Sequence, residues 1–208
     1  FFNVGLEYDP KALKNAEQNY NNLRIKYKRI DRWNDNFGKG AYLIQGDVNK
    51  MPFKSNFFDK VIMSEVAEHL PDDLKGLREV NRCMKKDGVL LLSVPNNSYP
   101  FLWDPINWIL ERGFQTHIHS GFFAGIWNQH VRLYSREQIL NVLEKAGFKI
   151  ESCEVQTRWS LPFNHYLINL GARLLASKVL PKDFAKQVNK FDHYSSEKRS
   201  PAVQLYLV

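Results

Sequence analysis

The chain has 208 residues, of which 44% are hydrophobic and 25% charged, a composition that is ordinary for a globular domain and excludes long disordered or low-complexity stretches. Lys and Arg outnumber Asp and Glu by 29 to 22, and the net charge of +7 could favour a phosphate-bearing, nucleic-acid or anionic-membrane partner, although a solvated basic surface is the simpler interpretation. The two cysteines, Cys83 and Cys153, exclude a disulfide framework and a cysteine zinc cluster and fit a reducing, intracellular setting. The chain contains no run of about 18 apolar residues, so no transmembrane helix is predicted.

The N-terminal part predicts a strand followed by a helix. Residues 2–6 have the apolar character of a strand, which ends at Glu7. Asp9 and Pro10 form a helix start, with an N-cap carboxylate and a proline at the first helical position. Apolar residues then recur at spacings of three and four and predict one helix face, made by Leu13, Ala16, Tyr20, Leu23 and Tyr27. The cations between residues 24 and 32 are interpreted as the basic end of this helix, where they suit its dipole.

Two strands with a polar loop between them are predicted next. The strands span 41–45 and 60–64, and the loop spans 49–58. A helix that Asp72 could cap follows, and its apolar face consists of Leu74, Leu77, Val80 and Met84.

The most apolar run of the chain lies at 89–94. Asp87 and Gly88 predict a turn just before it. A continuous apolar run of strand length is typical of a sheet that is covered on both faces, and Pro95 is expected to stop the strand.

The second half begins with a segment of a different kind. Residues 98–131 are rich in Trp, Phe and His and show no clean period. Ser135 and Gln138 then form a capping box, and Gly147 is a favourable residue just beyond the end of the helix that they open. The remaining predicted elements are a strand at 148–155, a helix that includes Leu167, Leu170, Leu174 and Leu175, and a last strand at 202–208.

Strands and helices alternate through most of the chain, which predicts a three-layer α/β domain with a mainly parallel sheet. In such sheets, ligands bind at the carboxyl ends of the strands. The residues expected to matter for function therefore follow the predicted strands: Glu7, Asp47, Ser64, Glu65, Pro95 and Asn96.

An ordered set of short motifs accompanies this pattern. Glu7 follows the first predicted strand, and the later motifs are Gly46-Asp47-Val48, Met51-Pro52-Phe53, Phe57-Phe58-Asp59-Lys60-Val61-Ile62, Ser64-Glu65-Val66-Ala67-Glu68-His69-Leu70, Leu77-Arg78-Glu79-Val80-Asn81-Arg82-Cys83-Met84-Lys85-Lys86-Asp87-Gly88 and Leu91-Leu92-Ser93-Val94-Pro95-Asn96. Closely over residues 3–97, and more loosely over 130–148, the chain resembles the class I S-adenosylmethionine-dependent methyltransferases of the type 11 kind. The resemblance implies a Rossmann-like three-layer sandwich, mostly parallel with an antiparallel C-terminal strand. It also implies a methyltransferase with S-adenosyl-L-methionine as cofactor, and the reducing setting that the two cysteines fit predicts a cytoplasmic location.

The chain departs from this family at its N-terminus. The family's first strand and glycine-rich loop, which hold the methionine part of the cofactor, should precede Glu7, and only six residues do so. We therefore expect residues 1–208 to form a single methyltransferase domain that is N-terminally incomplete or completed by a separate segment. Because the family's first strand lies at the centre of the sheet, the strands of Leu6 and Ile62 are expected to flank a gap rather than to pair directly.

The resemblance assigns four residues to the nucleoside part of the cofactor. Glu7 would accept hydrogen bonds from both ribose hydroxyls, and Tyr8 would pack on the adenine. Asp47 would accept a hydrogen bond from the adenine amino group, with Val48 lining the same pocket. The structural alternatives are a helix-cap or surface carboxylate at Glu7, a core or surface tyrosine, and an aspartate in a Gly-Asp turn.

The next motif carries the candidate chemistry. Ser64 and Glu65 would lie beside the methionine moiety and the acceptor. His69 could take a proton from an acceptor hydroxyl or amine, while a helix-face histidine bonded to backbone is the alternative. Glu65, Glu68 and His69 also resemble the acid/histidine set with which some quinone O-methyltransferases bind a divalent cation. Exposed acids on a helix are the commoner explanation, and no metal is predicted.

The aromatic segment 98–130 is interpreted as an insertion or lid that covers the acceptor. Trp103 and Trp127 are predicted to contact the acceptor, and His130 is a second candidate catalytic group. Arg132 could pair with an acidic substrate group, or with a protein carboxylate that fixes the insertion. The alternative for the whole segment is a small satellite core.

The sequence therefore predicts an S-adenosylmethionine-dependent methyltransferase for a small, apolar or aromatic acceptor, such as a quinone or a lipid precursor. One alternative is a different nucleotide-dependent enzyme, such as an NAD-dependent oxidoreductase, which would share the acidic ribose residue. The other is a non-catalytic binding protein that kept the fold. No nucleic-acid partner is expected, and contact between a helix at 163–180 and a membrane surface is a weaker expectation than its docking on the sheet.

Overall fold

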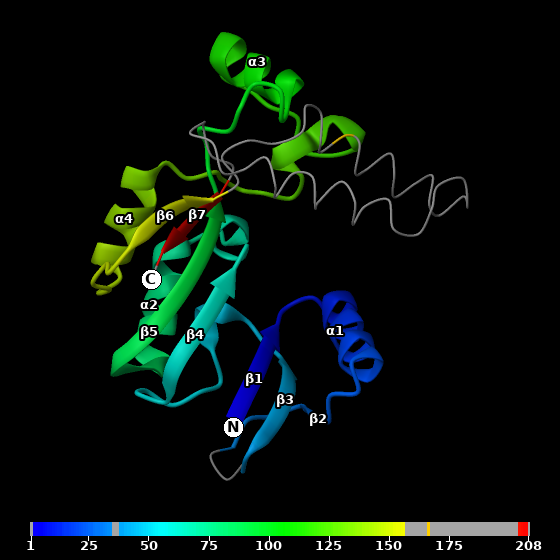
Figure 1. Ribbon diagram of the computed structural model, residues 1–208, viewed down its shortest axis with the longest axis vertical. Helices are drawn as coiled ribbons and strands as arrows, with labels where there is room; N and C mark the ends of the chain where they lie inside the picture. The colour runs from blue at the N-terminus through cyan, green and yellow to red at the C-terminus, as the bar shows by residue number, and fades with distance from the viewer. Residues whose placement is uncertain (1, 35–37, 157–165, 167–203, 208) are drawn as a thin grey trace. The chain divides into compact units, whose positions relative to one another are not determined.

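The computed structural model describes residues 2–34, 38–156, 166 and 204–207 (Figure 1). It divides into two compact units, one made of Phe1–Val61 with Leu74–Val89 and the other of Ile62–Asp73 with Leu90–Val208. Each unit is described by itself below. Within the described residues, no helix is long and apolar enough to cross a membrane.

The first unit contains a parallel sheet of three strands. These are β1 (Phe2–Glu7), β3 (Gly40–Gln45) and β2 (Tyr27–Ile30), in the order β1-β3-β2. Both neighbouring pairs are parallel, so the carboxyl ends of all three strands meet at one edge. The prediction of strands at 2–6 and 41–45 is confirmed, whereas the strand at β2 was not predicted.

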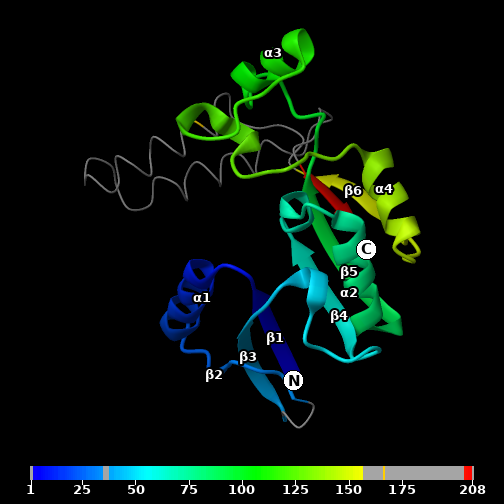
Figure 2. The same cartoon turned by 180° about the vertical axis from the view of Figure 1, so that it is seen from behind.

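Helix α1 (Pro10–Asn22) lies along this sheet, as both views show (Figures 1 and 2). It begins as predicted, with the Asp9 side chain accepting a hydrogen bond from a first-turn backbone N–H. The prediction that it continues into residues 24–32 is wrong. Asparagines are poor helix formers and end it at Asn22, after which the parallel pairing of β2 with β3 stabilises an extended backbone.

The core of the first unit lies between the sheet and helix α2 (Asp73–Cys83). Ile44 of β3 is buried against Phe53 and Cys83, and further apolar side chains pack on this cluster from Val4, Leu6, Ile30, Trp33, Met51 and Phe58. The predicted apolar face of α2 is confirmed at Leu77 and Val80, which are fully buried. Met84 is buried too, but it belongs to the next strand rather than to the helix.

The second sheet has four strands in the order β4-β5-β7-β6. Their bounds are Phe58–Ser64 for β4, Met84–Pro95 for β5, Gln204–Leu207 for β7 and Cys153–Gln156 for β6. β7 is antiparallel to both β5 and β6, which confirms the predicted antiparallel C-terminal strand. Among the described strands, β1 pairs with β3 and β4 neighbours β5, so Leu6 and Ile62 are not on directly paired strands, as expected.

Strand β5 runs through the position where a turn was predicted. Asp87 and Gly88 lie inside this strand, so the turn prediction is wrong. A Cβ at Gly88 would lie 3.1 Å from the carbonyl oxygen of Asp59 and 3.2 Å from that of Phe58. The glycine therefore permits a close approach of two backbones rather than a reversal of the chain.

The segment after β5 is more regular than its sequence suggested. It contains helix α3 (Pro105–Phe114) and the 3-10 turn η3 (Phe122–Trp127), where no periodic element was predicted. The buried Asp104 caps α3 and also accepts hydrogen bonds from the backbone N–H of Ile126 (2.9 Å) and the hydroxyl of Tyr166 (2.6 Å). One carboxylate thus joins α3, η3 and a residue far along the chain.

Helix α4 (Arg136–Lys145) confirms the local sequence signals. Both hydrogen bonds of the predicted capping box at Ser135 and Gln138 are present, and Gly147 has the left-handed φ of 91° that a residue beyond a helix end often needs. β6 begins later than the predicted strand at 148–155. The predicted helix near 167–175 lies outside the described residues.

Candidate functional site

Two predicted cofactor residues follow neighbouring parallel strands of the first unit. Glu7 stands opposite Gln45 in the register of β1 and β3, and the backbone N–H of Gly46 donates to the carbonyl of Glu7 (2.9 Å). Asp47 is the second residue after β3, so both carboxylates belong to the same edge of the sheet. A Cβ at Gly46 would lie 2.6 Å from Cδ1 of Leu6, so a larger residue in this turn would require the Leu6 side chain to shift.

The carboxylate of Glu7 keeps acceptor capacity for a ribose. Its Oε1 accepts a hydrogen bond from the backbone N–H of Asp9 (2.9 Å), and a carboxylate offers about four acceptor positions. The same bond is the helix-cap arrangement that was the structural alternative. Tyr8 is 73% exposed, which excludes the core alternative and leaves its ring accessible for stacking. These residues fit a nucleoside, and their roles stay predictions.

Asp47 caps the short 3-10 turn η1 (Val48–Lys50). Its Oδ1 accepts hydrogen bonds from the backbone N–H (2.8 Å) and the side-chain amide (3.0 Å) of Asn49. This is the turn that was the structural alternative, and it engages one of the two carboxylate oxygens. Val48 is half-buried beside it. The adenine role of both residues stays a prediction.

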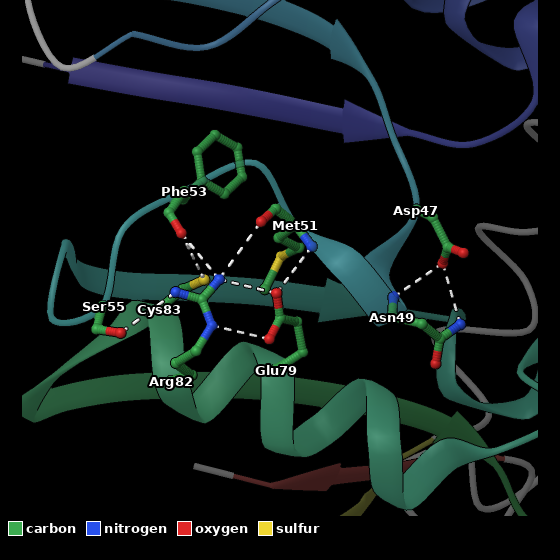
Figure 3. A network of polar contacts seen from close by, with 8 residues as sticks. All are labelled: Asp47, Asn49, Met51, Phe53, Ser55, Glu79, Arg82 and Cys83. Carbon is green, nitrogen blue, oxygen red and sulfur yellow. Dashed lines mark hydrogen bonds and ion pairs between the residues drawn. The ribbon is translucent and has the colours of Figure 1, made fainter.

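Glu79 and Arg82 of α2 form an ion pair that is hydrogen-bonded to the loop that follows Asp47 (Figure 3). The guanidinium of Arg82 donates to the carbonyl of Phe53 (2.8 Å) and, through Nε and one terminal nitrogen, to both carboxylate oxygens of Glu79 (2.8 Å each). Glu79 in turn accepts a hydrogen bond from the backbone N–H of Met51 (2.9 Å). These bonds lower the pKa of Glu79 and raise the pKa of Arg82.

Ser64 and Glu65, at the end of β4, form a short hydrogen-bond chain in the second unit. The hydroxyl of Ser93 donates to Oε1 of Glu65 (2.9 Å), so Ser64, whose Oγ lies 2.7 Å from that of Ser93, is the donor in their bond. Glu65 has a φ of 52°, a left-handed conformation that is uncommon outside glycine and clusters at functional sites. The predicted role of this pair beside the methionine moiety stays a prediction.

Three titratable side chains of the second unit, Glu68, His69 and His130, form one cluster. The carboxylate of Glu68 is 0% exposed, and neither oxygen has a hydrogen-bond partner among the described residues. Its Oε1 lies 3.6 Å from Nε2 of His69 and 3.9 Å from Nε2 of His130, and the two imidazole rings are 4.8 Å apart. Burial raises the pKa of Glu68 to about 8.

A backbone carbonyl fixes the tautomer of His69. Its Nδ1 lies 2.9 Å from the carbonyl oxygen of Gln129, which can only accept, so Nδ1 carries a proton, and in the neutral imidazole Nε2 faces Glu68 with a lone pair. The backbone N–H of Val131 donates to the carbonyl of Glu68 (3.0 Å) and ties the two segments together. His69 thus shows the backbone bond of the structural alternative and also has a second ring nitrogen, beside Glu68, that is not bonded to backbone.

The same cluster is where the described residues could hold a cation. One ligand atom from each of Glu68, His69 and His130 lies within 4.8 Å of the others. This set differs from the one suggested by the sequence, because His130 takes the place of Glu65, whose carboxylate is bonded to Ser93.

The two predicted acceptor-binding tryptophans pack on side chains of their own segment and on Leu133, which follows it. Trp127 stacks on His117 with the ring centroids 3.6 Å apart, and its indole N–H donates to Glu111. Trp103 and Trp127 both pack on a buried cluster that consists of Tyr99, Ile126 and Leu133. This is the satellite core of the structural alternative, and contact of either tryptophan with an acceptor stays a prediction.

Arg132 also makes the contacts of its structural alternative. Its guanidinium donates to the carbonyls of Leu70 (2.7 Å) and Pro71 (2.8 Å) and lies 3.2 Å from the carboxylate of Asp73. The arginine therefore joins the end of the insertion to the segment that carries His69. Pairing with a substrate stays a prediction.

Sequence reasoning missed two groups that shape these sites. Asp104 with Pro105 repeats the cap-and-proline signal that located α1, and would have located α3. Glu79 and Arg82 lie one helical turn apart, but their bonds to a distant loop leave no signal in the sequence.

Comparisons with known proteins match part of the chain to a methyltransferase family. Residues 3–92 match a family model described as a methyltransferase domain. The chain is 24% identical over 169 residues to the 2-methyl-6-phytyl-1,4-hydroquinone methyltransferase of Spinacia oleracea. The aligned region makes up 81% of this chain and 43% of that protein. It is 23% identical over 160 residues to a demethylmenaquinone methyltransferase of Staphylococcus carnosus. Here the aligned region makes up 70% of this chain and 57% of that protein. The chain therefore spans about half the length, or less, of these relatives.

Solved structures show the same fold. An S-adenosylmethionine-dependent methyltransferase of Methanosarcina mazei superposes with a TM-score of 0.55 at 12% identity, over 98% of this chain and 79% of that one. The YcgJ protein of Bacillus subtilis gives 0.54 at 16% identity, over 98% and 79%. The fold is a Rossmann-like α/β fold with an antiparallel C-terminal strand. Over residues 3–92 the chain thus matches the methyltransferase-domain family that the sequence resemblance indicated, and its fold is the one found in these solved structures.

Proposed function

We propose that the chain binds S-adenosylmethionine through Glu7 and Asp47 and methylates a small hydroquinone-type acceptor whose hydroxyl proton passes to His69. The observation that carries the acceptor chemistry is the cluster of Glu68, His69 and His130, in which Nε2 of His69 has a lone pair beside a buried carboxylate. The relatives named above are a hydroquinone and a demethylmenaquinone methyltransferase.

The proton transfer explains why this acceptor class suits these residues. A phenolic hydroxyl has a pKa of about 10, so it is protonated at neutral pH and is a poor nucleophile. Loss of the proton to His69 raises the electron density on the phenolic oxygen and on the ring carbons, either of which could take the methyl group. The imidazolium that forms lies 3.6 Å from the Glu68 carboxyl group, which stabilises the positive charge when it is ionised.

The cofactor, when bound, supplies an electrophilic methyl group on a sulfonium. Glu7 would orient the ribose and Asp47 the adenine, with Tyr8 and Val48 as apolar neighbours of the base. Ser64 and Glu65 are the residues proposed for the methionine end. Trp103 and Trp127 are proposed to shield the acceptor, His130 to share the proton of His69, and Arg132 to hold the insertion in place. A cytoplasmic location belongs to the same proposal.

The test uses the complete protein, S-adenosylmethionine with a labelled methyl group, and acceptors that present a hydroquinone, a catechol or an amine on the same apolar tail. His69→Asn should lower kcat for the hydroquinone by about 100-fold or more, since general bases contribute about 10²–10⁴ in rate. The affinity for S-adenosylhomocysteine should stay unchanged. The matched control is His119→Asn, an exposed histidine of the same unit. Equal rates in the two variants would contradict the proposal.

A further inference from the structure

The turn between α1 and β2 presents apolar side chains among cations. Leu23 is 70% exposed and Ile25 is 39% exposed. Five exposed cations surround them in the sequence: Arg24, Lys26, Lys28, Arg29 and Arg32. Asp31 is the only carboxylate between residues 24 and 32. We call residues 23–32 the basic–apolar surface.

The backbone holds this turn in a defined shape. The N–H of Leu23 donates to Asn19 (3.0 Å), that of Arg24 to Asn21 (3.0 Å) and that of Ile25 to Tyr20 (2.8 Å), in each case to the backbone carbonyl. Arg24 has a φ of 56°, in the left-handed region. The two aliphatic side chains are therefore exposed on an ordered turn. The prediction that Leu23 belongs to the apolar face of a helix is wrong, because the helix ends before it.

Strand β2 extends the surface along an edge. It is the outer strand in the order β1-β3-β2, and its exposed Lys28 and Arg29 stand among half-buried residues. Arg29 is paired with Glu17 of α1 (3.1 Å). Lysines on an edge strand also discourage pairing with another sheet, but that role does not call for exposed Leu23 and Ile25 beside them.

We propose that the basic–apolar surface docks on an anionic phospholipid bilayer. Cations attract the negatively charged headgroups, and exposed aliphatic side chains gain when they enter the boundary between headgroups and acyl chains. Docking would bring the protein to the phase in which an apolar acceptor dissolves. The inference goes beyond the proposed function, because it rests on the exposed residues of this turn and not on the acceptor chemistry.

A nucleic acid is the other polyanion that such a charge could attract, and the surface suits it less well. Single-stranded nucleic acids are bound by cations together with aromatic rings on which bases stack. The ring of Tyr27, the aromatic residue of this surface, packs edge-on against Tyr20 with the centroids 5.4 Å apart and is half-buried. Leu23 and Ile25 have no partner in a phosphate backbone.

The test is sedimentation of the complete protein with vesicles of phosphatidylcholine alone or mixed with phosphatidylglycerol. Binding should require the anionic lipid and weaken as salt is added, since salt screens exposed charges. Lys26→Gln with Lys28→Gln should weaken binding by about 30-fold, because each cation near such a surface contributes about 5-fold. Leu23→Ser should weaken it by roughly 5-fold.

The matched control is Lys11→Gln with Lys14→Gln, which removes the same charge from exposed positions of α1 in the same unit. This control should bind nearly as well as the unchanged protein. Equal losses in the two double variants, equal binding to neutral and anionic vesicles, or tighter binding of a single-stranded oligonucleotide than of vesicles would each overturn the inference. All substituted side chains are exposed, so unfolding midpoints should not change and will confirm that each variant is folded.

Discussion

Replacing Glu68 by glutamine should make the protein more stable, and by an amount that depends on pH. In the folded state, burial raises the pKa of this carboxyl from 4.5 to about 8. Between these two values the folded chain keeps a proton that the unfolded chain releases, so the stability of the unchanged protein falls as the pH rises. Glutamine has nearly the same shape and does not titrate, so the variant escapes this loss.

The size of the effect follows from the displacement of the pKa. One pKa unit corresponds to 1.36 kcal/mol, so the shift from 4.5 to about 8 amounts to about 5 kcal/mol once the pH exceeds 8. At pH 7 this difference in the free energy of unfolding between Glu68→Gln and the unchanged protein should be about 3 kcal/mol. We therefore expect the free energies of unfolding of Glu68→Gln and of the unchanged protein to agree near pH 4 and to diverge from there up to pH 8.

The assay is urea unfolding followed by circular dichroism at a series of pH values from 4 to 9. Both proteins contain the titratable neighbours His69, His130 and Glu65, so the difference between the two curves reports the replacement of Glu68 together with its coupling to these neighbours. Glu144→Gln, at an exposed position of α4, is the control and should follow the unchanged protein within a few tenths of a kcal/mol. A Glu68→Gln variant that is less stable at pH 8, or a difference that does not vary with pH, would refute the reasoning.

Three other substitutions or treatments test other parts of the structure. Glu7→Ala should lower the affinity of the complete protein for S-adenosylhomocysteine by about 2–4 kcal/mol, because charge-assisted hydrogen bonds to both ribose hydroxyls are lost; calorimetry that shows equal affinities would remove this assignment. Asp104→Ala should destabilise the segment around α3 by about 3 kcal/mol or more, because the N–H of Ile126 and the side chains of Asn107 and Tyr166 lose a buried acceptor. Hydrogen exchange over residues 98–130 measures this loss, and unchanged protection of these amides would contradict it. Dialysis against a chelator should leave methyl transfer unchanged if the cluster around Glu68 acts by proton transfer alone, whereas a rate restored by added divalent cation would show that the cluster holds a metal.

Elements that are fixed by local chemistry could be predicted from the sequence. The start of α1 at Asp9 and Pro10 and the capping box at Ser135 were predicted because each depends on hydrogen bonds within one turn. The end of α1 was not, because it depends on a competition between helix continuation and the pairing of β2 with a strand that comes later in the chain.

The candidate site likewise has a part that the sequence predicted and a part that depends on contacts between distant residues. Glu7 and Asp47 each follow a strand, and the pattern that predicts a strand depends only on residues adjacent in the sequence. The approach of His130 to Glu68 joins segments that are far apart in the chain, and the burial of the Glu68 carboxylate depends on both. A sequence shows the residue types in such a cluster, but only the packing of the chain determines which of them meet.

The order of strands in the second sheet affects how the protein can be made. β7 lies between β5 and β6, yet the ribosome completes it after both of its neighbours (Figure 1). Until residues 204–207 have emerged, β5 and β6 have no strand between them, and their backbone groups on the facing edges must be solvated or bound by another chain. The second sheet is therefore completed only after residues 204–207 have been synthesised, and a nonsense mutation a few codons before residue 204 would remove an internal strand of this sheet rather than an edge strand.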